Sequence, residues 1–198
     1  MIITLTSFKG GVGKTTSAIH LAAFLQQQAN TLLIDGDPNG SARQWAAPGK
    51  LPFAVADEKQ APKLMVGGQY QHFVIDTPAR PEATEIESLA SGCDLLILPC
   101  SPDALAIGAL MQMIEPLQQL QASFKILLTL IPPKPSKAGD EARELFKEAG
   151  LPLFDAGIRR LAAFQWASTQ GVTVDAAGDK MSGIAWDCYK QVGKEIDV

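Results

Sequence analysis

The sequence is poor in the residues that build disulfide frameworks and zinc sites, because its 198 residues include only three cysteines and two histidines. Cys93, Cys100 and Cys188 have no C-x-x-C spacing, which argues against both kinds of site and favours a reducing, cytoplasmic compartment. Basic residues are also few: 17 lysines and arginines against 21 acidic residues give a formal net charge of −4. This balance argues against a constitutively polycationic nucleic-acid binder.

Long apolar runs and a basic leader are missing as well. Nowhere do about 18 consecutive apolar residues occur, and Met1 is followed directly by a strand-like segment, so we expect neither a membrane span nor a secretion signal. What is present is 46% hydrophobic and 19% charged residues. This composition is typical of a well-packed protein and predicts one domain over residues 1–198.

Short apolar runs alternate with segments of helical periodicity. The runs that suit strands buried on both faces are Ile2–Thr6, Thr31–Ile34, Phe73–Ile75, Leu95–Leu98 and Lys125–Ile131. The segments with apolar residues three and four positions apart are Thr16–Gln28, Glu82–Ala90, Leu105–Leu120 and Ala138–Ala149. The alternation predicts an α/β fold with a doubly wound, mostly parallel twisted sheet and helices on both faces.

The pattern weakens after Gly150. It predicts a short strand near Phe154–Ile158, a helix near Ala162–Thr169 and a final helix near Ser182–Ile196. The apolar face of the final helix consists of Ala185, Cys188, Tyr189, Val192 and Ile196. A membrane-targeting helix should carry a basic polar face, whereas the charges here are of both signs. We therefore expect this helix to pack on the core and predict no membrane partner.

The segment between Ser7 and Thr16 carries the strongest functional signal. Its sequence, S-F-K-G-G-V-G-K-T-T, follows a strand-like run and precedes a helix. Glycines let successive backbone N–H groups face phosphate oxygens, and the helix N-terminus adds its positive dipole end. Lys14 would reach the β- and γ-phosphates of ATP, and the Thr15 hydroxyl would bind Mg²⁺. The residues of this loop expected to bind the nucleotide are Gly10, Gly11, Val12, Gly13, Lys14, Thr15 and Thr16.

The strict phosphate-loop pattern would place glycine where Phe8 stands. The stretch K-G-G-V-G-K-T-T that begins at Lys9 resembles instead the deviant Walker A motif of the ParA/MinD family of ATPases, in which the position of Phe8 is free and an additional lysine occupies the position of Lys9. The resemblance implies that Lys9 crosses a homodimer interface and acts on the nucleotide of the second subunit, in the manner of an arginine finger. Catalysis would then require dimerisation.

Two aspartates that follow strand-like runs fit the same family. The stretch L-L-I-D-G-D-P-N-G resembles its switch I segment, and the resemblance assigns to Asp37 the orientation of the attacking water and a place in the Mg²⁺ shell. Asn39 departs from the glutamine common there in plasmid-partition members. From residue chemistry alone, Asp35 and Asp37 could instead end the strand and cap the next helix. Asp76, after H-F-V-I, is the Walker B candidate and would accept a hydrogen bond from Mg²⁺-bound water.

The resemblance is less specific in the rest of the chain. It places the adenine at Pro132 and Pro133, although proline offers only a flat apolar contact and the backbone would have to supply hydrogen bonds. The length is typical of the small ParA type, such as ParF, and the sequence is also similar to the carboxysome-positioning McdA-type group. The implied cargo is a plasmid or a carboxysome. The implied partner is a ParB-like or McdB-like adaptor that stimulates a weak intrinsic ATPase activity.

Binding of nonspecific DNA by the ATP dimer is a further property that the resemblance implies, together with a nucleoid-associated location. The candidates for contacts to the phosphate backbone are Arg159, Arg160, Lys180, Lys190 and Lys194. These charges, balanced by nearby aspartates, are equally consistent with a solvated surface, and the sequence leaves both interpretations open.

Two other functions use the same phosphate loop. A metabolic ATP-dependent ligase of the dethiobiotin or cobyrinate amide synthase type would need a concave polar substrate site, and its glutamine-dependent form would need an amidotransferase domain for which the chain has no room. A MinD-like membrane-associated regulator is disfavoured by the mixed charges of the final helix. The sequence therefore favours a ParA-type ATPase that positions a cargo.

Overall fold

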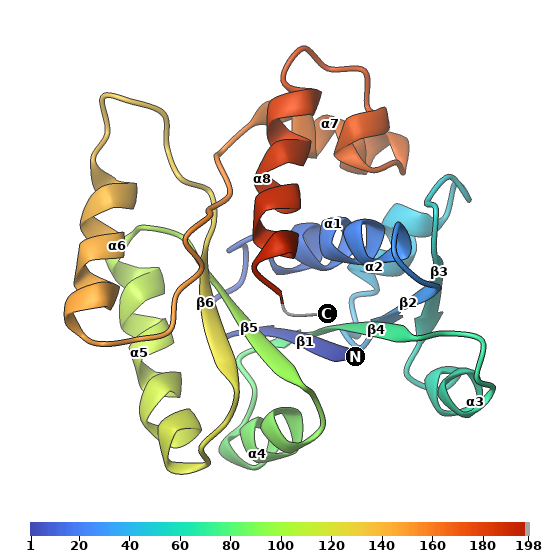
Figure 1. Ribbon diagram of the computed structural model, residues 1–198, viewed down its shortest axis with the longest axis horizontal. Coiled ribbons are helices and arrows are strands. Elements are labelled where there is room, and N and C mark those ends of the chain that lie inside the picture. The colour runs from blue at the N-terminus through green and yellow to red at the C-terminus, as the bar shows by residue number, and fades with distance from the viewer. Residues whose placement is uncertain (197–198) are drawn as a thin grey trace.

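The computed structural model describes residues 1–196, apart from the side chains of residues 83 and 84. Within these residues the strands form a six-stranded sheet in the order β3-β2-β4-β1-β5-β6, and each neighbouring pair is parallel (Figure 1). The strands are β1 (Ile2–Ser7), β2 (Thr31–Asp35), β3 (Ala54–Asp57), β4 (His72–Ala79), β5 (Leu95–Cys100) and β6 (Phe124–Leu128). The expected α/β class and the parallel sheet are confirmed.

Helices cover both faces of this sheet. They are α1 (Lys14–Gln26), α2 (Ser41–Ala46), α3 (Ala61–Val66), α4 (Ala83–Ser91), α5 (Ala104–Gln119), α6 (Ala138–Glu148), α7 (Ala162–Gln170) and α8 (Ser182–Lys194), with a 3₁₀ turn, η1, at Val174–Ala176. Residues of α1, α2, α7 and α8 share one hydrophobic cluster, whereas those of α3 to α6 pack on the opposite face. Figure 1 shows the two layers on either side of the strands.

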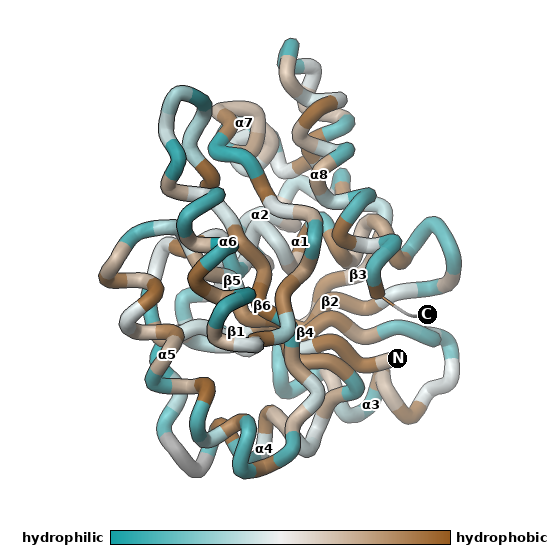
Figure 2. The backbone as a smooth tube through the Cα atoms, turned by 60° about the vertical axis from the view of Figure 1, so that its left-hand side comes forward, coloured by the Kyte–Doolittle hydropathy of each residue, from teal (hydrophilic) through white to brown (hydrophobic). Residues whose placement is uncertain are grey.

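The strands are buried on both faces because successive side chains alternate between the two helix layers. Leu33 packs with α1 and its neighbours, whereas Leu32 and Ile34 pack on the side of α3. In the same way Ile97 faces one layer and Leu96 faces the other. Figure 2 shows the resulting band of hydrophobic residues along the strands, with hydrophilic residues gathered in the loops.

The chain changes direction across the sheet near β1 and β4. From β1 it runs to β2 and β3 at one edge, returns to β4, and then crosses β1 to reach β5 and β6. In open α/β sheets, ligands bind at such a switch point, beyond the carboxyl ends of the strands. The glycine-rich segment after β1 lies at this place.

Besides the 3₁₀ turn η1, three elements escaped the sequence analysis, and one expected strand is wrong. The missed elements are β3, α2 and α3, each of four to six residues. The strand expected at Phe154–Ile158 is absent from the described residues, which contain only isolated bridges on either side of it. The amides of Phe154 and Ile158 donate to the carbonyls of Ile126 and Leu128. Because the segment advances four residues while β6 advances two, a continuous ladder cannot form.

The remaining expected elements are confirmed, with shifts at their ends, of which the largest is at β4, where His72–Ala79 replaces the expected Phe73–Ile75. The strand expected at Lys125–Ile131 ends at Leu128, and Leu130 two residues later has a left-handed backbone with φ 51°. The final helix packs on the core as expected, where it contacts α1 and buries Ala185, Tyr189 and Val192. Within the described part of the chain, none of the helices combines the length and apolar character that a membrane crossing requires.

Candidate functional site

The backbone of the glycine-rich loop is shaped to receive an anion. Gly11 and Gly13 have φ of 78° and 84°, a left-handed conformation that glycine adopts without strain, and Gly13 precedes the first turn of α1. Within the described residues, the backbone N–H groups of Gly10–Thr16 have no protein acceptor. Thr129 Oγ1 donates to the carbonyl of Val12 over 2.6 Å and fixes the loop against the end of β6. Open amides at a helix N-terminus are the arrangement that binds phosphate.

The Lys14 side chain lies at the buried base of this loop, which we call its floor. Its Nζ donates to Asp76 Oδ1 at 2.9 Å and to the carbonyl oxygen of Thr77. Asp76 is completely buried and Lys14 is 8% exposed. The other carboxylate oxygen of Asp76 accepts a hydrogen bond from Thr15 Oγ1 at 2.6 Å. The predicted phosphate lysine, metal hydroxyl and Walker B carboxylate therefore form one contiguous cluster.

Burial dominates the electrostatics of that cluster. It raises the pKa of Asp76 above its ordinary value, and the charge of Lys14 and the hydrogen bond from Thr15 offset only part of this rise. The hydroxyl and carboxylate oxygens are the hard donors that Mg²⁺ prefers. On donor chemistry, Thr15 and Asp76 fit a magnesium ion at this point.

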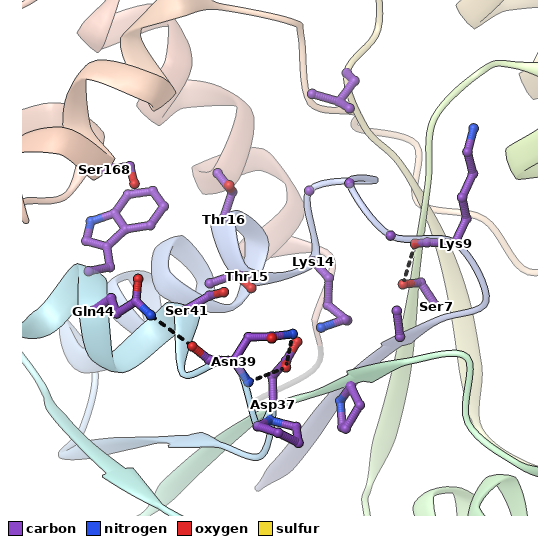
Figure 3. A pocket seen from close by; sticks show the side chains of 18 residues that line it. Ser7, Lys9, Lys14, Thr15, Thr16, Asp37, Asn39, Ser41, Gln44 and Ser168 are labelled. Carbon is purple, nitrogen blue, oxygen red and sulfur yellow. Dashed lines mark hydrogen bonds between the residues drawn. The ribbon is translucent and has the colours of Figure 1, made fainter.

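A cavity of about 990 Å³ opens over the loop (Figure 3). Its lining includes Gly10, Gly11, Gly13, Lys14, Thr15 and Asp37, together with Trp45 from α2. A second cavity of about 580 Å³ shares part of this lining and continues toward α7 and α8. The lining residues that the sequence analysis missed include Trp45, Leu130, Ser168 and, in the second cavity, Thr129, Phe164 and Gln165. None of them carries a sequence signal, because apolar and small polar residues line cavities as commonly as they fill cores.

Asp37, which follows β2, also lines the cavity and is half-buried. Its Oδ1 accepts hydrogen bonds from both the backbone N and the side-chain Nδ2 of Asn39, each at 2.9 Å. The carbonyl of Asn39 in turn accepts from Gln44 Nε2 (Figure 3). Asp37 therefore presents a half-buried carboxylate to the cavity, and its other oxygen, Oδ2, takes no part in these two bonds.

Asp35 has a different role from Asp37, although both follow β2. The buried Asp35 carboxylate accepts hydrogen bonds from the backbone N–H of Arg43 at 2.9 Å and from that of Asp37 at 3.2 Å. Arg43 is in the first turn of α2, so Asp35 satisfies a free amide at the start of this helix. The capping interpretation therefore holds for Asp35, whereas Asp37 bonds within its own turn.

Lys9 is directed away from the floor of the loop. Its Nζ forms an ion pair with Asp103 Oδ1 at 2.7 Å, and both side chains are partly exposed. Figure 3 shows the Lys9 side chain extending away from Lys14. Asp103, at the start of α5, was not among the expected site residues, although an aspartate just before an apolar helical segment is a recognisable capping signal.

The proline loop does not line either cavity. Pro132 is half-buried and Pro133 is exposed, and neither borders the space next to the phosphate loop. The residues that do border this space include Thr129, Leu130 and Ile158. The assignment of the adenine to Pro132 and Pro133 stays a prediction.

The five basic candidates for DNA contacts are not gathered in one place. Arg160 lines the second cavity, next to the phosphate loop. Lys180 precedes α8 and Lys194 ends it, so the length of the helix, about 20 Å, separates them. Lys190 pairs with Asp187 at 2.5 Å on the same helix. Arg159, like Lys180 and Lys194, is exposed. A DNA-binding role for these residues stays a prediction.

A family profile described as "CobQ/CobB/MinD/ParA nucleotide binding domain" matches residues 3–174. The chain belongs to this family. It is therefore a phosphate-loop ATPase of the ParA and MinD type, in agreement with the geometry of the loop and with the expectation from the deviant Walker A motif.

Individual family members cover nearly the whole chain. The maintenance of carboxysome distribution protein A of Gloeobacter kilaueensis is 33% identical over 99% of this chain and 94% of its own. A variant of Cyanothece McdA solved with ATP has a TM-score of 0.72 at 18% identity and covers 100% of this chain and 97% of that chain. MinD from Pyrococcus horikoshii solved with Mg-ADP has a TM-score of 0.74 at 18% identity, with 99% and 95% coverage.

Proposed function

We propose that this ParA-type ATPase binds Mg-ATP, dimerises around the nucleotide, coats nonspecific DNA as a dimer and positions a cargo until an adaptor stimulates hydrolysis. The proposal depends most on the contrast between the two lysines of the loop. Lys14 is buried against Asp76, whereas the Lys9 amine is bound at the rim by Asp103 and is accessible to a second subunit. The relative named for carboxysome distribution favours a carboxysome as the cargo, with a plasmid as the alternative.

Nucleotide binding requires an exchange of partners at the floor of the loop. Lys14 must release Asp76 Oδ1 and the Thr77 carbonyl to contact the β- and γ-phosphates. The free amides of Gly10–Thr16 would bind the phosphate oxygens, as they do in phosphate loops generally. The second cavity, continuous with the first, has room for the nucleoside.

Thr15 and Asp76 would hold Mg²⁺, the threonine directly and the aspartate through water. Bound there, the ion would neutralise charge on the phosphates. The chain's own contribution is to keep both oxygens within 2.6 Å of each other and to bury the carboxylate. When Lys14 turns to the phosphates, Asp76 is left as an acceptor for the metal-bound water.

Asp37 would orient the attacking water from the rim. Removal of its carboxylate should leave ATP binding intact and slow hydrolysis, so we expect Asp37→Ala to accumulate the ATP-bound dimer. The measurement is steady-state phosphate release beside sizing in ATP, with Asp140→Ala on α6 as the control for loss of an exposed carboxylate. A wild-type hydrolysis rate in Asp37→Ala would contradict the assigned role.

The experiment that tests the proposed function is a mobility-shift titration of random duplex DNA with protein that is free, ADP-bound or ATP-bound. It is run at two stated salt concentrations, because contacts to the DNA backbone weaken steeply with salt. The same samples are sized. We expect a DNA shift and a dimer only with ATP.

Other outcomes separate the alternatives. A dimer in ATP that leaves DNA unshifted even at low salt would reject the nucleoid model, and binding of anionic vesicles would then indicate a MinD-like regulator. A monomer in ATP that consumes ATP only with a small-molecule acceptor would indicate a metabolic ligase.

The basic candidates for DNA contacts are tested by Lys180→Ala and Lys194→Ala, each of which should reduce the salt dependence of DNA binding if it contacts a phosphate.

A further inference from the structure

The ion pair between Lys9 and Asp103 joins two loops that are far apart in the sequence. Lys9 follows β1, and Asp103 follows β5, the neighbouring strand. The two atoms are 2.7 Å apart, and the side chains are 34% and 47% exposed, so the pair lies at the surface, where a second protein can compete for the lysine.

Asp103 is held in place independently of Lys9. Its Oδ1 accepts the backbone N–H of Ala106 at 3.0 Å, which caps the first turn of α5, and its Oδ2 accepts Ser101 Oγ at 2.6 Å. The hydrogen bonds from Lys9 and Ser101 lower the pKa of Asp103 to about 2. The carboxylate is therefore a fixed, fully ionised anion at neutral pH, and Lys9 is the mobile member of the pair.

The groove beside Lys9 offers the lysine no second anion. It has a volume of about 460 Å³ and is lined by Phe8, Lys9, Arg80, Leu105, Ala109 and Gln112. None of these side chains is acidic, and Arg80 carries the same charge as Lys9. A Lys9 amine that leaves Asp103 is therefore not captured elsewhere in this groove.

We propose that Asp103 is a positioning residue that holds Lys9 on its own subunit and thereby opposes formation of the ATP dimer. The inference rests on the proposed function, in which Lys9 acts on the nucleotide of the second subunit. To cross the interface, Lys9 must exchange Asp103 for a phosphate, and it does so only when ATP on the other subunit supplies a stronger anion. Formation of the ATP dimer therefore breaks the Lys9–Asp103 ion pair in each subunit.

The size of the effect follows from the exposure of the pair. An exposed ion pair changes an equilibrium by about fivefold at most, and a symmetric dimer breaks two of them. In Asp103→Asn the charge is removed, while asparagine keeps the capping hydrogen bond from Ala106. We therefore expect the dimer Kd, measured in a non-hydrolysable ATP analogue, to fall up to about 25-fold in this variant.

The experiment is sedimentation of wild type, Asp103→Asn, Lys9→Met and the double variant in that analogue, at low and high salt. If Asp103 acts through Lys9, Asp103→Asn tightens the dimer in the Lys9 background and has no effect in the Lys9→Met background. High salt should remove the difference between wild type and Asp103→Asn, because salt screens exposed pairs. Glu115→Gln, the same charge change on the exposed face of α5, is the matched control and should leave Kd unchanged.

The outcomes distinguish this inference from the proposed function. If wild type does not dimerise in the analogue, both fail. If wild type dimerises and Asp103→Asn dimerises with the same or a weaker Kd, the role assigned to Asp103 is overturned while the proposed function stands. An effect of equal size in the Lys9→Met background would also overturn it, because Asp103 would then act through the cap alone.

Discussion

The contacts in and near the phosphate loop fall into two groups that differ in exposure to water. We call the buried group the inner side and the group at the surface the outer side. On the inner side, Lys14 is buried against Asp76, and His20, two turns further along α1, is enclosed by aromatic rings. On the outer side, Lys9 pairs with Asp103 at the surface, and Asp37 bonds to Asn39 within an exposed turn. The inner contacts are shielded from water, whereas the outer ones compete with it.

Because of this difference, the two sides contribute differently to the stability of the fold and to its response to ligands. Buried polar groups that lose a partner destabilise the fold strongly, so the inner side can change only when a ligand replaces the lost contact. The outer groups can exchange partners at little cost. We expect the inner side to determine stability and the outer side to determine the response to nucleotide and to a second subunit.

The largest expected effect is at Lys14. In Lys14→Met the buried Asp76 carboxylate loses its cation, so we expect the free energy of unfolding at pH 7 to fall by about 3 kcal/mol, with loss of ATP binding. Urea unfolding and nucleotide titration measure the two effects. Adding Asp76→Leu should recover part of the lost stability, since a buried pair can be replaced by apolar side chains. A loss of stability below about 1 kcal/mol, as for an exposed ion pair, would contradict the view that the inner side determines stability.

An effect of similar size is expected at His20 on acidification. His20 Nδ1 donates to the Thr16 carbonyl at 2.7 Å, and its Nε2 accepts the Val174 N–H at 3.0 Å, so the ring is neutral in the fold. Burial lowers its pKa from 6.5 to about 4. Between these values the unfolded chain binds a proton that the folded chain does not, so stability falls as the pH decreases through this window, by about 3 kcal/mol in full.

Urea unfolding of wild type and His20→Asn between pH 7 and pH 4 measures this contribution. The variant should show a shallower decline. Burial also lowers the pKa of His72, the other histidine. His72→Asn therefore serves as the control that shows how much of the decline in stability with falling pH comes from His72. Identical slopes in wild type and His20→Asn would show that the imidazole is not the sensitive group.

The smallest expected effect is at Lys9. Its partner and its own side chain are partly exposed, so Lys9→Met should change the free energy of unfolding by less than about 1 kcal/mol. Adaptor-stimulated hydrolysis should nevertheless be lost, because the variant cannot supply a cation across the interface. Thermal unfolding and phosphate release separate the two. A stability loss as large as that of Lys14→Met would show that the outer contacts are structural.

The strong local signals in the sequence were reliable guides to the fold. β1 and β5 were predicted from continuous apolar runs because strands buried on both faces need apolar residues at every position. Short elements with weak signals were missed. β3 has four residues, Ala54–Asp57, and lies at the edge of the sheet next to β2. α2 and α3 have six residues each, too few for a helical period to be recognised.

The sequence by itself identified the phosphate loop and singled out Lys14, Thr15 and Asp76 as candidate site residues, because glycine spacing, a following helix and a hydrophobic strand ending in aspartate are local patterns. Only the tertiary structure decided the role of Asp35 at α2, the burial of His20 and the pairing of Lys9 with Asp103. Lys9 and Asp103 meet because β1 and β5 are neighbours in a parallel sheet, whose carboxyl ends meet at one edge. Strand order is a property of the whole chain, and no local pattern encodes it.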